Sequence, residues 1–249
     1  MPIEVGQHNL EIQANAEHWR RKPLLQKIYR DFYNEIAGEL RSDVPGATVE
    51  IGSGIGNLKT VVPEALATDI FPNPWLDRIE NAYAMSFVDG SVANLILFDV
   101  WHHLEYPGTA LSEFHRVLVP EGRLIIFDPA MGLLGRIVYG LFHHEPLGLR
   151  DRIRWDAPPG FSPDQMTYYA AQGNAHRIFF SGERASQLAD WRMVRRSLFA
   201  GLPYVGSGGF RGPQLYPETL LPALRAVDRM ASRVPALFAT RLLVTLEKK

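Results

Sequence analysis

The sequence predicts an α/β fold with a doubly wound, mostly parallel sheet. Short apolar runs alternate with amphipathic stretches, and a glycine-rich turn follows the first apolar run. Strands separated by helical stretches of about 10 to 15 residues are typical of parallel sheets. With 249 residues, 46% of them hydrophobic, the chain is long enough for one sizeable core. We therefore expect a single domain over residues 1–249.

An N-terminal helical cap is predicted over residues 1–45. Apolar side chains recur at helical spacing from Leu24 to Leu40. Pro45 and Gly46 then end the element before the first strand.

Six apolar runs predict strands, and the stretches between them predict helices. Val92–Phe98 is nearly continuous apolar sequence, which is typical of a central parallel strand buried on both faces. One helix is expected to begin at Asn57, whose side chain suits the capping position, and another at Pro107. The strands are expected at Ala47–Ile51, Ala65–Asp69, Val92–Phe98, Arg123–Phe127, Met193–Phe199 and Thr240–Leu246.

Residues 131–190 interrupt this alternation. The segment joins an amphipathic stretch, Leu133–Phe142, to the Pro/Gly-rich sequence Trp155–Pro163. Long irregular insertions in compact domains tend to be functional. We expect a lid or acceptor-binding insertion here, after the fifth strand. Residues 191–249 are expected to supply a terminal strand pair and a helix.

The stretch from Thr48 to Asn57 reads TVEIGSGIGN, an apolar strand that runs into a glycine-rich turn. Glycines permit positive φ and let the main chain approach a ligand closely. A dinucleotide-binding fingerprint needs G-x-G-x-x-G and places a pyrophosphate at a helix N-terminus. Here the third glycine comes one residue early, and Glu50 would repel a pyrophosphate but suits a cationic ligand. An NAD(P) oxidoreductase is therefore disfavoured.

Four acidic residues are expected along one edge of the sheet. Glu50, Asp69, Asp99 and Asp128 each lie at the end of a predicted strand. In open α/β sheets, ligands bind outside the carboxyl ends of the strands. At the end of the second strand, the carboxylate of Asp69 can accept hydrogen bonds from both hydroxyls of a ribose.

Four segments in order resemble the class I S-adenosylmethionine (SAM) dependent methyltransferases. The turn resembles the family's motif I, E-x-G-x-G-x-G. The resemblance covers about residues 47–129. The other segments are Asn81–Asn94, similar to D-A-x-x-L-P-F-x-D-x-S-F-D, Phe98–Leu104, similar to a strand exit ending in His-His-Leu, and Ser112–Leu124, similar to L-x-E-x-x-R-V-L-x-P-G-G-x-L.

This resemblance implies a Rossmann-like, seven-stranded sheet with a SAM-binding core over residues 46–130. It implies SAM as the cofactor and S-adenosylhomocysteine as its product. Asn81 stands where the family has an acidic residue that accepts from the adenine amino group, and Ala82 would offer its backbone N–H to the ring. The residues implied to bind the cofactor are Glu50, Gly52, Ser53, Gly54, Gly56, Asp69, Asn81, Ala82, Phe98 and Asp99.

His102 and His103 follow the fourth strand, where the methyl acceptor is expected. A neutral imidazole near pH 7 suits a general base; alternatively, one of the two rings packs under the following helix. His143, His144 and Glu145 offer metal-binding side chains, but they lack the H-E-x-x-H spacing. We therefore expect no metal.

Composition and charge limit the classes of binding partner and the cellular location that we expect. The formal net charge of −1 and short basic clusters do not favour nucleic acid. The absence of cysteine excludes disulfides and thiolate chemistry. No apolar stretch reaches the roughly 18 residues that span a bilayer, and no signal peptide is recognisable. These features favour a soluble, cytoplasmic protein without a transmembrane segment.

Two functions remain open. The leading one is methyl transfer from SAM to a small-molecule, lipid-linked or saccharide acceptor. We expect an apolar acceptor if aromatic residues line its pocket. The candidates for that lining are Trp155, Phe161, Tyr168 and Tyr169. The alternative is a non-catalytic SAM-binding or regulatory module, expected if the insertion over residues 131–190 closes the acceptor pocket.

Overall fold

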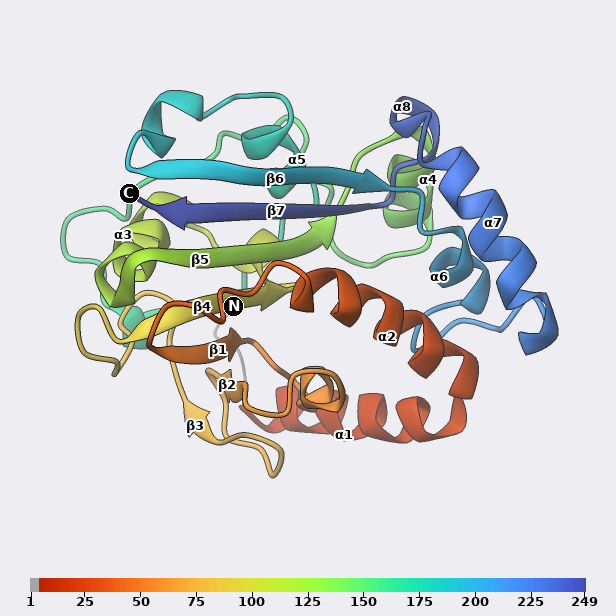
Figure 1. The fold of residues 1–249 in the computed structure, drawn as a ribbon, viewed down its shortest axis with the longest axis horizontal. Coiled ribbons are helices and arrows are strands. Elements are labelled where there is room, and N and C mark those ends of the chain that lie inside the picture. The colour runs from red at the N-terminus through yellow and green to blue at the C-terminus, as the bar shows by residue number, and fades with distance from the viewer. Residues whose placement is uncertain (1–4) are drawn as a thin grey trace.

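A computed structural model describes residues 5–249, which build a seven-stranded sheet flanked by helices (Figure 1). The strand order is β3-β2-β1-β4-β5-β7-β6. Strands β1 to β5 pair in parallel, and β7 runs antiparallel to both of its neighbours. This confirms the predicted α/β fold. The strands are β1 Ala47–Ile51, β2 Leu66–Asp69, β3 Arg78–Ile79, β4 Val92–Phe98, β5 Leu118–Pro129, β6 Trp191–Phe199 and β7 Arg241–Lys248.

Helices cover both faces of the sheet and the edge where the parallel strands end (Figure 1). Within residues 5–249, no helix combines the length and the apolar character that crossing a bilayer requires. The α-helices are α1 Val5–Arg21, α2 Pro23–Ala37, α3 Pro107–Val117, α4 Leu133–Leu141, α5 Asn174–Phe179, α6 Leu202–Ser207, α7 Leu221–Ala231 and α8 Pro235–Phe238. The short 3-10 turns are η1 Asn57–Thr60, η2 Trp101–His103, η3 Pro163–Gln165, η4 Ala185–Leu188 and η5 Glu218–Leu220.

The central strand β4 shows how its apolar sequence divides between two cores. Leu95 and Leu97 pack in the core that includes α3 and α5. Ile96, which points to the opposite face, packs in the core that includes α2. Successive side chains of a strand alternate between faces, so a strand covered on both sides must be apolar throughout.

The prediction of a helix from Asn57 is wrong. Only the 3-10 turn η1 forms, and no side chain caps it, because the capping position is held by Gly56 in the left-handed conformation. The β-branched pair Val61 and Val62 and then Pro63 follow. Proline disfavours helical geometry in the residue before it, so the turn cannot extend.

The predicted N-terminal cap consists of two helices, α1 and α2. The sequence analysis did not delimit α1, and α2 ends at Ala37 rather than near Leu40. A Cβ added at Gly54 would lie 3.7 Å from Cδ1 of Ile12. Helix α1 therefore lies against the glycine turn that follows β1.

The insertion over residues 131–190 is bound to the edge of the sheet. Its backbone N–H of Ala171 donates to the carbonyl of His102 at 2.9 Å, and that of Gly132 donates to the carbonyl of Ala239 at 3.0 Å. The segment thus forms a wall beside η2. A lid movement of this wall stays a prediction.

A buried ion pair joins the start of β7 to the end of β4. The side chain of Arg241, which is 1% exposed, contacts both carboxylate oxygens of Asp99, with the longer N–O distance at 3.0 Å. The guanidinium lies 4.5 Å from the ring centre of Tyr204 and 5.8 to 6.0 Å from those of Phe127 and Phe98. Aromatic faces attract such a cation, so one arginine fixes strands and covering helix together.

Replacing Asp99 with Asn should lower the free energy of unfolding by about 3 kcal/mol, because it leaves the Arg241 charge buried without a counterion. Asn preserves the side-chain size and tolerates the positive φ of 56° at this position. Asp31→Asn is the matched control, because it breaks the exposed pair with Arg225 and should cost less than about 1 kcal/mol. Urea unfolding measures both. Equal, small losses would contradict this account of the buried pair.

Candidate active site

The glycine-rich turn after β1 has the predicted backbone. Gly52, Gly54 and Gly56 have φ values of 70°, 54° and 67°, which only glycine adopts readily. A Cβ added at Gly52 would also lie 2.4 Å from Cγ2 of Val100. The backbone N–H of Ser53 donates to the carbonyl of Thr68 at 2.8 Å. The turn is therefore fixed between the ends of β2 and β4.

Glu50 lies buried at the end of β1 without a cationic partner in contact. Glu50 is only 4% exposed, and its Oε2 has no hydrogen-bond partner among the described residues. Burial, together with the nearby charge of Asp69, raises the pKa of Glu50 to about 8. A buried carboxyl group without a partner is costly, and a cationic ligand would stabilise its charged form.

Asp69, at the end of β2, holds the turn directly. Its Oδ2 accepts from the backbone N–H of Gly54 at 3.1 Å, and its Oδ1 accepts from that of Ile70 at 2.7 Å. Each carboxylate oxygen can accept a further hydrogen bond. The predicted ribose contact is compatible with this geometry and stays a prediction.

Asn81 links the core to the insertion. Its Nδ2 donates to the carbonyl of Pro163 at 3.1 Å, and its Oδ1 accepts from the backbone N–H of Tyr83 at 3.0 Å. Ala82 beside it is buried. The adenine contacts expected of Asn81 and Ala82 stay predictions.

Phe98 and Asp99 lie at the end of β4 and have structural partners. The Phe98 ring stacks on Phe127, with centroids 5.2 Å apart and planes 2° apart. Asp99 forms the ion pair with Arg241. The contacts predicted between these two residues and the cofactor stay predictions.

His102 lies buried in η2, directly after β4, between two carboxylates. Its Nδ1 is 2.9 Å from Oδ1 of Asp128, which is fully buried near the end of β5. Its Nε2 is 3.5 Å from Oε2 of Glu145. The predicted edge position of His102 is confirmed, and Asp128 shares it.

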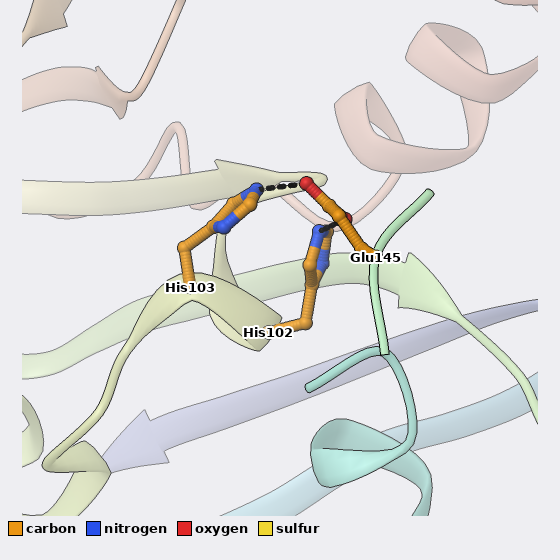
Figure 2. A group of neighbouring side chains, drawn as sticks. All are labelled: His102, His103 and Glu145. Carbon is orange, nitrogen blue, oxygen red and sulfur yellow. Dashed lines mark ion pairs between the residues drawn. The ribbon is translucent and has the colours of Figure 1, made fainter. Parts of the chain in front are cut away.

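His103 points toward the same glutamate (Figure 2). Its Nδ1 lies 2.9 Å from the carbonyl oxygen of Tyr169, and its Nε2 lies 3.7 Å from Oε1 of Glu145. The exposed fraction of the His103 side chain is 34%, so this ring borders the open side of the site.

Glu145 is the functional residue that the sequence analysis did not connect with the histidine pair. It comes from the insertion over residues 131–190, and its side chain is almost fully buried. The Tyr168 hydroxyl and the Gln172 amide donate to its two oxygens. The only sequence signal for Glu145 is that it directly follows two histidines, His143 and His144.

The two histidines differ in their electrostatics. Burial opposes a charge on His102, but Asp128 and Glu145 outweigh this and raise the pKa of His102 to about 10. Burial and the charge of His102 lower the pKa of His103 to about 4. Burial alone would raise the pKa of Glu145, yet its contacts with both histidines lower it.

A small pocket opens beside His103 and is lined by aromatic side chains together with polar ones, including Glu105 and Thr167. Its lining includes Tyr83, Tyr106, Phe161 and Met166. Phe161, one of the predicted acceptor-pocket aromatics, thus lines the same pocket as His103. Trp155 packs instead against the first turn of α3, where a Cβ added at Gly108 would lie 2.3 Å from the indole Nε1.

Comparisons with known proteins agree with this geometry. Residues 49–126 match the model of a methyltransferase domain family, whereas a search of curated proteins finds no match. A geranyl diphosphate C-methyltransferase from Streptomyces coelicolor A3(2) superimposes with a TM-score of 0.52 at 11% identity, covering 89% of this chain and 79% of that one. A SAM-dependent methyltransferase from Archaeoglobus fulgidus gives 0.52 at 14% identity, covering 90% and 94%. At these identities the two structures show a shared fold.

The pKa of Glu50 predicts how SAM affinity depends on pH. Below about pH 8 the ligand-free carboxyl holds a proton, which it must release to face a cation. The affinity of the wild-type protein should therefore fall up to about tenfold per pH unit as the pH drops below 8. Calorimetry from pH 6 to 9 measures this slope, and a flat profile in the wild type would contradict it.

Glu50→Gln is the companion variant. It should weaken SAM binding at least about tenfold. It should also remove the pH dependence of SAM affinity, except for the part that comes from titration of SAM itself. The folded carboxyl binds a proton up to about pH 8, whereas the unfolded one titrates near 4.5. The wild-type free energy of unfolding therefore falls as pH rises between these values, and Gln should increase it at pH 8 by about 1 kcal/mol or more. Glu64→Gln, at an exposed position, should change neither quantity.

Asp69→Ala should weaken SAM binding at least about tenfold, since it removes charge-assisted hydrogen bonds worth about 1.5 to 3 kcal/mol each. Asp69→Asn, which keeps an acceptor oxygen, should lose less. Asp77→Ala is the control, because Asp77 also accepts from a backbone N–H of β2, that of Ala67 at 2.8 Å, but forms no hydrogen bond with residues 52–56 among the described contacts. A folded Asp69→Ala variant with unchanged affinity would reject the ribose assignment.

Proposed function

Because this chain belongs to the class I SAM-dependent methyltransferases, we propose that it methylates a small-molecule, lipid-linked or saccharide acceptor held beside His102 and His103. One observation carries the proposal. The two histidines follow β4 at the edge of the sheet that also bears the glycine turn, and the insertion over residues 131–190 encloses them.

Methyl transfer is an in-line displacement at the sulfonium carbon. The acceptor's lone pair forms a bond to the methyl carbon while the S–C bond breaks, and that bonding pair returns to sulfur in S-adenosylhomocysteine. An O–H or S–H acceptor also gives up its proton. The protein contributes mainly by aligning the two reactants and excluding water.

His103 is placed to take part in the activation of the acceptor. Its Nδ1 faces the carbonyl oxygen of Tyr169, which can only accept a hydrogen bond, so Nδ1 carries the ring proton. Nε2, which faces Oε1 of Glu145 at 3.7 Å, then keeps its lone pair. His102 lies behind it, held in position by Asp128.

The surroundings of the pair favour an apolar or lipid-linked acceptor. Three aromatic rings, those of Tyr83, Tyr106 and Phe161, line one side of the pocket beside His103, which Glu105 and Thr167 also line. The insertion also exposes apolar side chains at the end of α4, with Leu141 74% and Phe142 81% exposed. Such surface suits contact with apolar material, and the net charge of −1 gives no general attraction to nucleic acid.

The experiment is to incubate the protein with methyl-labelled SAM and a cell extract. Label should enter the organic-soluble and small-molecule fractions, and the protein and nucleic acid fractions should stay unlabelled. Label that appears mainly in protein or nucleic acid would overturn the acceptor class.

The histidine variants test the acceptor side of the same reaction. His103→Ala and His102→Ala should lower turnover by about 10² to 10⁴ with SAM affinity unchanged, whereas Asp69→Ala should lower the affinity. His102→Ala also removes a buried partner of Asp128, so its melting temperature is measured alongside. A folded His103→Ala variant with wild-type turnover would refute the role of this ring.

A further inference from the structure

We propose that His102, His103 and Glu145 form a binding site for a divalent transition-metal ion with the ligand preference of Zn²⁺. Each residue offers one ligand atom, and these atoms lie within 4.8 Å of one another. The three side chains converge from two segments, η2 and the insertion (Figure 2). The sequence alone indicates no metal site, because Glu145 and the two histidines before it lack the H-E-x-x-H spacing.

The distances fit shared coordination better than hydrogen bonding. The Nε2 atoms of His102 and His103 lie 3.5 and 3.7 Å from the two oxygens of Glu145. An N–H···O bond is about 2.7 to 3.2 Å long, so both contacts are too long. Two ligands at about 2.0 to 2.1 Å from one tetrahedral zinc lie roughly 3.4 Å apart, which is close to both separations.

The hydrogen bonds behind the rings fix which atoms face the cluster. Asp128 and the carbonyl of Tyr169 each accept from an Nδ1, so both Nδ1 atoms are donors. Once His102 has also released the second proton that its raised pKa favours in the metal-free site, both Nε2 lone pairs point toward a carboxylate, and three acceptors meet. A cation at their centre would satisfy all three.

Supporting contacts of this kind are typical of metal sites. Ligating histidines usually donate their other N–H to a carboxylate or a backbone carbonyl, and His102 and His103 show one partner of each type. The ligating carboxylate is also oriented, since Tyr168 and Gln172 both donate to Glu145. The cluster is therefore held in place without a metal.

The donor set selects the class of ion. Two imidazoles and one carboxylate are the ligands of catalytic zinc sites that keep a fourth position open. Mg²⁺ and Ca²⁺ prefer oxygen ligands, so they should bind poorly here. The partly exposed ring of His103 leaves access for a further ligand.

The role of the ion rests on the proposed function, although its binding does not. An acceptor O–H or S–H bound at the open position would lose its proton to solvent more easily, because the metal lowers its pKa. The resulting oxygen or sulfur lone pair would then attack the methyl carbon as described above. Metal binding itself is measurable without SAM or acceptor.

The test uses the full chain after dialysis against a chelator. Titration with Zn²⁺, followed by calorimetry, should give one ion per chain, and Co²⁺ should produce the visible absorption of a low-coordinate site. Glu145→Gln and His103→Asn should each weaken Zn²⁺ binding at least about a hundredfold and abolish the Zn²⁺-dependent rise in melting temperature.

His115→Gln is the matched control, because it removes a histidine on α3 that contacts Trp191, and it should bind Zn²⁺ as the wild type does. No stoichiometric binding, or equal affinity in all four proteins, would overturn the site. Full turnover of the chelator-treated wild type would overturn the role of the ion in the reaction. A chain that binds Zn²⁺ at this site but methylates nothing would refute the proposed function and leave the metal site standing.

Discussion

Buried charge at the carboxyl edge of the sheet is the constraint on which the rest of the structure depends. A carboxylate out of water needs a partner, and the partners here come from other segments. Asp99 at the end of β4 is held by Arg241 at the start of β7, and Asp128 near the end of β5 is held by His102. Asp128 and Glu50 each keep one unpartnered oxygen, and Glu50 is the exception because no cationic side chain among the described residues pairs with it. The pairs fix the edge, and the exception marks where a ligand would supply the missing charge.

The fold was predictable where local sequence and burial agree. The bounds of β1 and β4 were predicted correctly, because a short apolar run ends at a glycine turn in the first case and an unbroken apolar run fills a two-sided core in the second. The prediction of a helix from Asn57 was wrong. It relied on Asn57 as a capping residue and did not take into account Pro63, six residues later, which prevents the turn from extending. The bounds of helix α1 were not predicted, because its sequence is mostly polar and shows no clear apolar periodicity.

The site was predictable only in part, because its two halves have different origins in the chain. The glycine turn and Asp69 lie within one continuous strand-turn-strand unit, so their proximity follows from sequence order. The meeting of Glu145 with His102 and His103 depends on how the insertion folds back over η2. Its irregular segments carry no periodic pattern that would place one side chain. Tertiary packing alone brings the glutamate to the histidines.

The strand order separates these halves and sets their charge requirements. Winding reverses between β1 and β4, the switch point at which open sheets bind ligands. On one side, β1 presents Glu50, whose charge a cationic ligand would neutralise, and β2 presents Asp69, for which we predict a contact with the ribose. On the other side, Glu145 lies where an acceptor must become electron-rich to attack the methyl carbon. A carboxylate would repel an electron-rich acceptor unless a positive charge balances it. A proton on His102, whose pKa is raised, can supply that charge, and so can a cation bound where both histidines converge on Glu145.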